Sequence, residues 1–134
     1  MTPDAIRSAL AGHLANNLPS GLTAADVAWP NRAFTPPAGL WARFTCLPGV
    51  AEEREKGAAG VGLRAGVLII GLFAPLGSGT SAVLGIAAAI ESLYRRASVG
   101  GVMCGEPYTE EPGDDGQGRY LVKTTIPFQA WTGE

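Results

Sequence analysis

Metal-binding and nucleophilic side chains are scarce in this sequence. Its 134 residues include one histidine, His13, and two cysteines, Cys46 and Cys104, which form no Cys-x-x-Cys pair. A structural zinc site needs four such ligands at short spacings, so we predict no metal site. The start of the chain lacks the basic and apolar regions of a secretory signal. We therefore expect folding in a reducing cytosol with both thiols free.

Charged residues are also few. They make up 16% of the chain, with a formal net charge of −2, against about 25% charged residues in a typical domain. A protein that binds DNA through its phosphates needs clustered lysine and arginine, which this balance does not supply. Hydrophobic residues make up 46% of the chain, so many uncharged groups must lie on the surface. This composition suits a subunit whose faces are covered by other subunits.

Long hydrophobic runs are absent as well. The longest apolar stretch, residues 65–75, is too short to span a bilayer, and we expect no membrane helix. The length of the chain is typical of one domain and allows a core without disulfide or metal support. We predict a single domain over residues 1–134.

The hydrophobic spacing predicts two helices and five strands. The first helix is capped by Thr2 and carries isoleucine or leucine at every fourth position to about Asn17. The second begins at Thr80 or Ser81 and ends near residue 96. The predicted strands are 27–29, 40–47, 63–74, 99–103 and 120–131. The order α-β-β-β-α-β-β predicts an α+β fold, with a mainly antiparallel or mixed sheet and both helices packed on one face.

The strand at 63–74 is expected at the centre of the sheet. Its middle, residues 67–70, is apolar on both faces, which is typical of a strand covered on either side. The polar, glycine-rich segment from Pro48 to Gly62 predicts a long exposed β-hairpin arm. The acidic segment from Glu106 to Gly118 is expected to be a loop.

No residues form a recognisable catalytic or cofactor-binding motif. The turn from Pro75 to Thr80 joins a strand to a helix as a phosphate loop does, but Gly79 stands where a P-loop has lysine. His13 lies beside the apolar stripe of the first helix without an accompanying serine or cysteine motif. The acidic pairs 52–53, 110–111 and 114–115 lie on segments expected to be solvated. We predict a protein that is not an enzyme and binds no cofactor or metal.

Trp41 and Arg43 are candidates for an interface. Most aromatic residues of the chain are expected in the core. The alternation of strand 40–47, however, places Trp41 and Arg43 opposite the face that carries Ala42 and Phe44. Tryptophan and arginine are enriched at protein interfaces, so we predict that both contact another subunit.

Several short motifs, taken in order, resemble the tail terminator (tail completion) proteins of long-tailed bacteriophages. The first half of the chain carries Trp29-Pro30-Asn31, Gly39-Leu40-Trp41-Ala42-Arg43 and Leu47-Pro48. In the second half, the strand Gly66-Val67-Leu68-Ile69-Ile70 leads into Phe73-Ala74-Pro75-Leu76-Gly77-Ser78-Gly79, and the chain closes with Ile126-Pro127-Phe128. The resemblance covers nearly the whole chain and rests on the order and spacing of these motifs.

The resemblance implies a structural virion protein of a siphophage. It implies a ring, usually a hexamer, that caps the head-proximal end of the tail tube, ends tube polymerisation and offers a head-tail joining surface. The implied partners are further copies of the chain, the tail tube protein and a head-completion (stopper) protein. Genomic DNA would pass through the channel without specific binding, and assembly would take place in the host cytoplasm. Two alternatives remain: another tail-tube or head-tail connector subunit of related fold and, more distantly, a small-molecule-binding α/β module.

A ring of identical subunits needs two different contact patches on each subunit. Besides Trp41 and Arg43, we expect the charged part of the arm to contribute to contacts with a neighbour or with the tube: Glu52, Glu53, Arg54, Glu55 and Lys56. A channel for DNA should not attract phosphate. We therefore expect acidic residues to line it, either those of the arm or Glu110, Glu111, Asp114 and Asp115.

Overall fold

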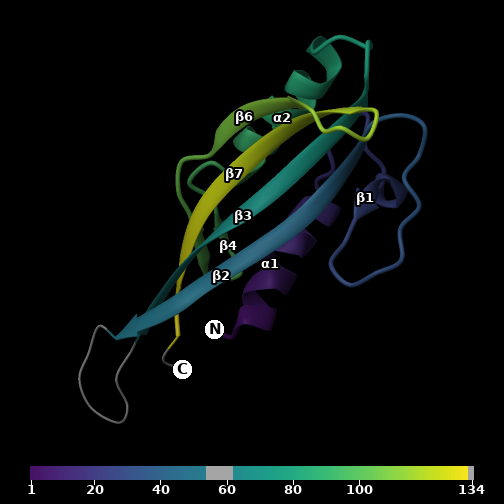
Figure 1. The fold of residues 1–134 in the computed structure, drawn as a ribbon. Coiled ribbons are helices and arrows are strands. Elements are labelled where there is room, and N and C mark those ends of the chain that lie inside the picture. The colour runs from purple at the N-terminus through teal and green to yellow at the C-terminus, as the bar shows by residue number, and fades with distance from the viewer. Residues whose placement is uncertain (54–61, 133–134) are drawn as a thin grey trace.

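The computed structural model describes residues 1–53 and 62–132 and contains two helices and a curved sheet (Figure 1). In chain order the elements are α1 (Pro3–Ala15), the short 3-10 helix η1 (Ala24–Asp26), β1 (Val27–Ala28), β2 (Trp41–Glu53), β3 (Gly62–Pro75), α2 (Ser81–Tyr94), β4 (Ser98–Val99), β5 (Val102–Cys104), β6 (Tyr108–Asp114) and β7 (Arg119–Trp131). The predicted α+β class is confirmed.

The seven strands form one mixed sheet. Its order is β1-β2-β3-β7-β5-β4, and β6 pairs with β7 beside β5. β1 runs parallel to β2, and the other pairs are antiparallel. β3 lies between β2 and β7, so its predicted central position is confirmed. The two ends of the sheet are therefore β1 with the exposed edge of β2, and β6 with β4.

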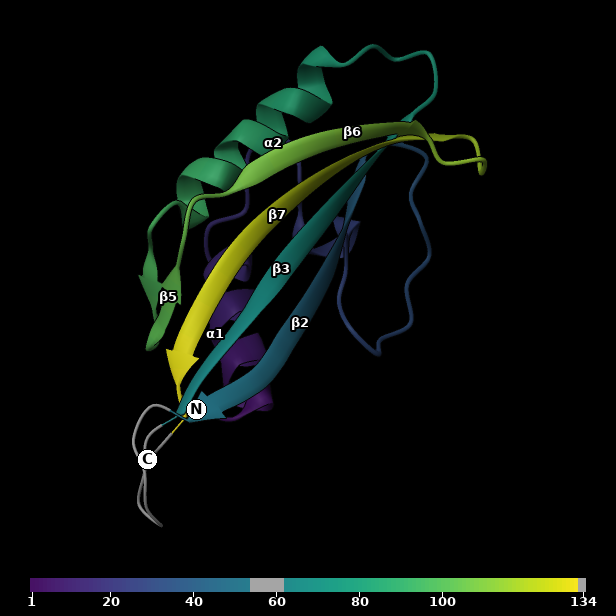
Figure 2. The ribbon, with the colours of Figure 1, turned by 60° about the vertical axis from the view of Figure 1, so that its left-hand side comes forward.

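Both helices pack on one face of the sheet, behind β2, β3 and β7 in Figure 1 and to their left and rear in Figure 2. The core between them is built from alternate strand residues and the apolar helix stripes: Ile6, Leu10 and Leu14 of α1, Val83, Ile86 and Ile90 of α2, Phe44 of β2, Leu68, Ile70 and Leu72 of β3, and Val122, Ile126 and Phe128 of β7. The predicted stripe of α1 is confirmed.

Tyr94 joins the two helices. Its side chain is fully buried, and its hydroxyl donates a hydrogen bond of 2.7 Å to the carbonyl oxygen of Leu10 in α1. Burial raises the pKa of Tyr94 well above its ordinary range. The His13 ring lies edge-on to Tyr94, and its Nε2 is 3.0 Å from the carbonyl oxygen of Leu93. His13 therefore has a structural place between α1 and α2.

The expectation that β3 is covered on both faces is wrong. Val67 and Ile69 point away from the helices and are only half-buried. Leu47 on β2 is 50% exposed and Tyr108 on β6 is 51% exposed on the same outer face. The apolar run at 67–70 predicts apolar side chains on both faces of the strand. The pattern alone does not tell a face that is covered by helices from one that is left partly exposed.

Two strand predictions need correction. The expected loop 106–118 contains strand β6, whose residues are mostly exposed and therefore lack the apolar alternation of a half-buried strand. A register shift between Glu110 and Gly113, with Pro112 inside it, interrupts the pairing. The strand expected at 99–103 is instead a small hairpin of β4 and β5, because Gly100 and Gly101 turn the chain with φ of 54° and 92°. Glycine tolerates this left-handed turn.

The cap of α1 is confirmed, since Thr2 Oγ1 accepts a hydrogen bond of 3.1 Å from the Ala5 amide. Thr80 occupies the corresponding position of α2 but makes no side-chain capping bond.

The predicted arm begins as an extension of the β2-β3 hairpin. The two strands stay paired as far as Glu53 and Gly62, with a register shift between Pro48 and Ala51. The backbones approach closely at the shift, where a Cβ atom on Gly66 would lie 2.4 Å from the Leu47 carbonyl oxygen. Only glycine fits there.

Candidate interaction surfaces

Trp41 and Arg43 lie on the outer face of β2, as the alternation predicts. Trp41 stacks on Phe73 of β3, with ring centroids 4.2 Å apart and planes at 10°, and the Phe34 ring lies 5.2 Å away. Only 5% of Trp41 is exposed. The Arg43 guanidinium is exposed and lies 5.4 Å from the centre of the Trp41 ring. Of the two, Arg43 presents its side chain to solvent, and Trp41 supports it from beneath.

A cavity of about 500 Å³ opens beside the free edge of β2. Three arginines from three different segments and four aromatic side chains line it: Arg7, Arg32, Arg43, Trp29, Phe34, Trp41 and Phe44. We call this cavity the arginine pocket. Within the described residues, no aspartate or glutamate lines it.

The arginine pocket holds hydrogen-bond donors that lack acceptors. Among the described residues, the buried Nε of Arg7 and the buried Nε1 of Trp41 have no partner. Arg32 and Arg43 form no ion pair with any carboxylate in the same part of the chain. Buried donors are rarely left unpaired in folded proteins. The pocket is thus an electropositive cavity with donors in excess of acceptors.

The acidic residues predicted near a channel gather on the β6-β7 hairpin. Glu110 lies 3.9 Å from Lys123 Nζ, and Glu111 accepts a hydrogen bond of 2.9 Å from the Tyr120 hydroxyl, which raises the pKa of Tyr120. Asp114 and Asp115 accept backbone N–H bonds within the turn. The structure therefore brings these four residues together at the sheet edge opposite β1.

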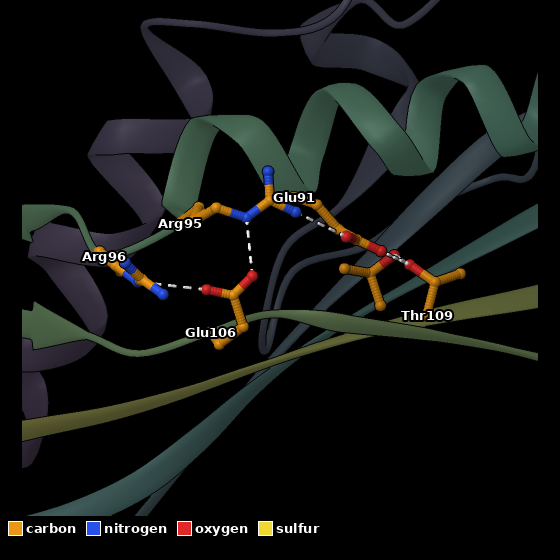
Figure 3. A network of polar contacts seen from close by, with 6 residues as sticks. Glu91, Arg95, Arg96, Glu106 and Thr109 are labelled. Carbon is orange, nitrogen blue, oxygen red and sulfur yellow. Dashed lines mark hydrogen bonds and ion pairs between the residues drawn. The ribbon is translucent and has the colours of Figure 1, made fainter.

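A second charged cluster ties α2 to the segment before β6 (Figure 3). Glu106 binds both Arg95, at 2.9 Å, and Arg96, at 3.3 Å. Glu91 binds Arg95 at 3.1 Å and accepts a hydrogen bond from the Thr109 hydroxyl. The two arginines that follow α2 are therefore neutralised within the chain, in contrast to those of the arginine pocket.

The charged part of the arm is only partly placed. The backbones of Glu52 and Glu53 pair with Leu63 and Gly62. The side chains of Glu52 and Glu53, and the whole of Arg54, Glu55 and Lys56, lie outside the described residues. The interface role predicted for these five residues stays a prediction.

The cysteines are buried in the core, and neither takes part in a disulfide. Burial raises the pKa of Cys104 to about 11. It also raises the pKa of Cys46, where Arg7 partly opposes the effect. In the described part of the chain, no group of three or more His, Cys, Asp or Glu side chains is placed to hold a metal ion.

We expect both thiols to react with an aromatic disulfide reagent at pH 8 at least about tenfold more slowly in the native chain than in urea, because only thiolates react.

The raised pKa of Cys104 also predicts a pH dependence of stability. The pKa of a cysteine in the unfolded chain is about 8.5. The contribution of the Cys104 thiol to the free energy of unfolding is therefore complete below that pH and is lost as the pH rises toward about 11. Urea unfolding at pH 8 and pH 10 measures this loss, with Cys104→Ala as the control that reduces it. Labelling of the native chain as fast as in urea would contradict the expected protection of the thiols, and equal stability at both pH values would contradict the expected pH dependence.

The comparison with protein families decides the identity. A family model described as "Phage tail terminator protein" matches residues 5–128. The chain belongs to the phage tail terminator family. One solved structure matches 97% of this chain and 96% of its own length at 23% identity, with a TM-score of 0.72. That likeness concerns the fold alone. No curated protein matches the sequence.

The tail terminator family is a family of structural proteins of the phage tail. Its members are components of the virion tail and contact other tail proteins. The resemblance identified from sequence motifs is thereby confirmed. No helix of the described residues combines the length and hydrophobicity needed to cross a bilayer.

For this tail terminator, sequence reasoning missed Arg7 and Arg32 as site residues. They lie on α1 and on the segment after β1, and only the fold brings them beside Arg43. One sequence signal was available: residues 27–50 contain Arg32 and Arg43 but no aspartate or glutamate. Residues 106–118 show the reverse, with five acidic residues and no lysine or arginine.

Proposed function

We propose that this tail terminator forms a closed ring of six copies at the head-proximal end of the tail tube. There the ring ends tube polymerisation and presents the surface on which the head-completion protein docks. The ring would form in the host cytoplasm during assembly, and genomic DNA would pass through its channel without specific binding. The protein acts through its shape and contact surfaces and has no enzymatic role.

One observation carries the ring proposal: the sheet has two unlike edges. The arginine pocket lies at the edge formed by β1 and β2, whereas β6, with its glutamates, forms the opposite edge. A surface that must meet a different surface produces head-to-tail contacts, which close into rings when the rotation between subunits permits. The exposed apolar residues of the outer sheet face supply further area for contacts with a neighbour or with the tube.

We assign the predicted interface residues within this ring. Arg43, supported by Trp41, contacts the neighbouring subunit. The charged arm residues Glu52, Glu53, Arg54, Glu55 and Lys56 contact a neighbour or the tube protein. Asp114 and Asp115, at the turn of the β6-β7 hairpin, line or rim the channel, where carboxylates repel the phosphates of passing DNA.

Electron micrographs of the purified full-length protein test the assembly. We expect closed rings one subunit thick, with a mass by light scattering that matches six copies of 13.8 kDa. Head-to-tail contacts that fail to close produce filaments instead. Long tubes would therefore contradict a terminator and favour a tail-tube subunit, and a monomer at all concentrations would contradict self-assembly.

A further inference from the structure

The arginine pocket is built to receive an anion that the described chain does not supply. Its three arginines come from separate segments, and no carboxylate among the described residues neutralises them. By contrast, Arg95 and Arg96 share Glu106, and Lys123 lies beside Glu110. Arg64 and Arg119 also lack a carboxylate partner among the described residues, but each donates to backbone carbonyl oxygens. The pocket is therefore the place where three arginines without an ion-pair partner gather.

The unpaired donors define the kind of anion. Trp41 is 95% buried, and its Nε1 can only donate a hydrogen bond. Arg7 Nε is likewise a buried donor; both residues line the pocket, and neither nitrogen has an acceptor among the described residues. The planar guanidinium group pairs with the two oxygens of a carboxylate in a fork geometry. The aromatic walls, Trp29 and Phe34, accommodate the aliphatic part of a side chain. A carboxylate side chain meets all of these requirements, and the longer stem of glutamate gives it more reach than aspartate.

Glutamates with spare acceptor capacity lie at the other end of the sheet. Glu106 and Glu91 are already bound by Arg95 and Arg96, which follow α2. Glu110 is 57% exposed and only 3.9 Å from its lysine partner, and Glu111 is exposed and holds the Tyr120 hydroxyl. Since β2, β3 and β7 separate β6 from the pocket, these glutamates can reach an arginine pocket only in another copy.

We propose that the arginine pocket of one copy binds Glu110 and Glu111 on strand β6 of the next copy. This contact rests on the proposed ring and specifies which edges of the subunits meet. It places these two glutamates at the subunit contact rather than in the channel, and leaves the channel to the acidic turn at Asp114 and Asp115.

Charge reversal in the full-length protein tests the contact. Arg32 is exposed and outside the core, so Arg32→Glu should leave the fold intact while raising at least tenfold the protein concentration at which rings half-dissociate. Glu111→Arg should weaken the ring similarly, and the double variant Arg32→Glu/Glu111→Arg should restore most of the wild-type assembly. Arg96→Glu is the matched control, because the Arg96 side chain is 80% exposed and lies outside the pocket; it should leave assembly unchanged.

Disulfide trapping offers a second measurement that does not depend on ring strength. The variant Arg32→Cys/Glu111→Cys should form a ladder of covalently linked subunits under mild oxidation, whereas each single variant should form none. If the wild type forms rings, both single charge-reversal variants form rings of the same strength, and the double-cysteine variant forms no ladder, this contact is overturned while the proposed ring stands. Failure of the wild type to form rings would instead overturn the proposed function.

Discussion

Replacing Ile70 by aspartate is expected to unfold the chain. Ile70 is fully buried in the middle of β3, with Phe44 and Thr124 opposite it on the neighbouring strands. Among the described residues, the buried polar side chains are those of Thr124 and Thr125, so no buried cation is there to pair with a carboxylate. An unpaired charge inside a protein costs several kcal/mol even after relaxation, about 3–5 kcal/mol or more. The lost apolar contacts add about 2–4 kcal/mol.

Together these losses are comparable to the free energy of unfolding of a typical domain, which is about 5–15 kcal/mol. Far-UV circular dichroism and urea unfolding should show no cooperative transition for Ile70→Asp. Ala65→Asp is the matched control on the same strand, because Ala65 is exposed and its carboxylate would stay in water. We expect it to unfold cooperatively, within about 1 kcal/mol of the wild type. A cooperatively folded Ile70→Asp variant would show that the core is elsewhere.

Elements with one apolar face could be predicted from the sequence. The stripe of α1 and the alternation around Phe44 follow from burial on one side, which the periodicity of the sequence records directly. The sequence of β6 shows no apolar alternation, because its side chains are mostly exposed and its place in the sheet comes from backbone hydrogen bonds to β7. Backbone hydrogen bonds do not require apolar residues at alternate positions, so the sequence of this strand predicts a loop.

The same limit applies to the interaction surfaces. The outer-face position of Arg43 follows from alternation within a single strand. The arginine pocket does not, since Arg7 and Arg32 reach it from other elements. The outer sheet face is a further case: the apolar residues at 67 and 69 suggested a covering layer, and the described chain provides none. Apolar residues without a covering layer in one subunit fit a protein that buries them on assembly.

Shortening Trp41 separates its packing role from its hydrogen-bonding role. Trp41→Ala removes a ring that is 5% exposed and stacked on Phe73. The loss in free energy of unfolding should be about 3 kcal/mol. This value is near the lower end for buried aromatic residues, because Trp41 already borders a cavity. Trp41→Phe keeps a ring on Phe73 and removes the indole N–H that has no acceptor among the described residues. Its loss should stay below about 1 kcal/mol, since an unsatisfied donor is itself destabilising.

Assembly should be weakened by both substitutions, because both remove the indole N–H. If the indole N–H binds a glutamate of the next copy, Trp41→Phe weakens the ring although the isolated subunit is hardly affected. Urea unfolding of dilute protein measures the first quantity, and light scattering over a concentration series measures the second. A Trp41→Phe variant that loses as much stability as Trp41→Ala would mean that the indole already has a partner within the subunit. The pocket would then have no unmet donor at Trp41 to offer a neighbour, and its charge alone would have to account for any binding.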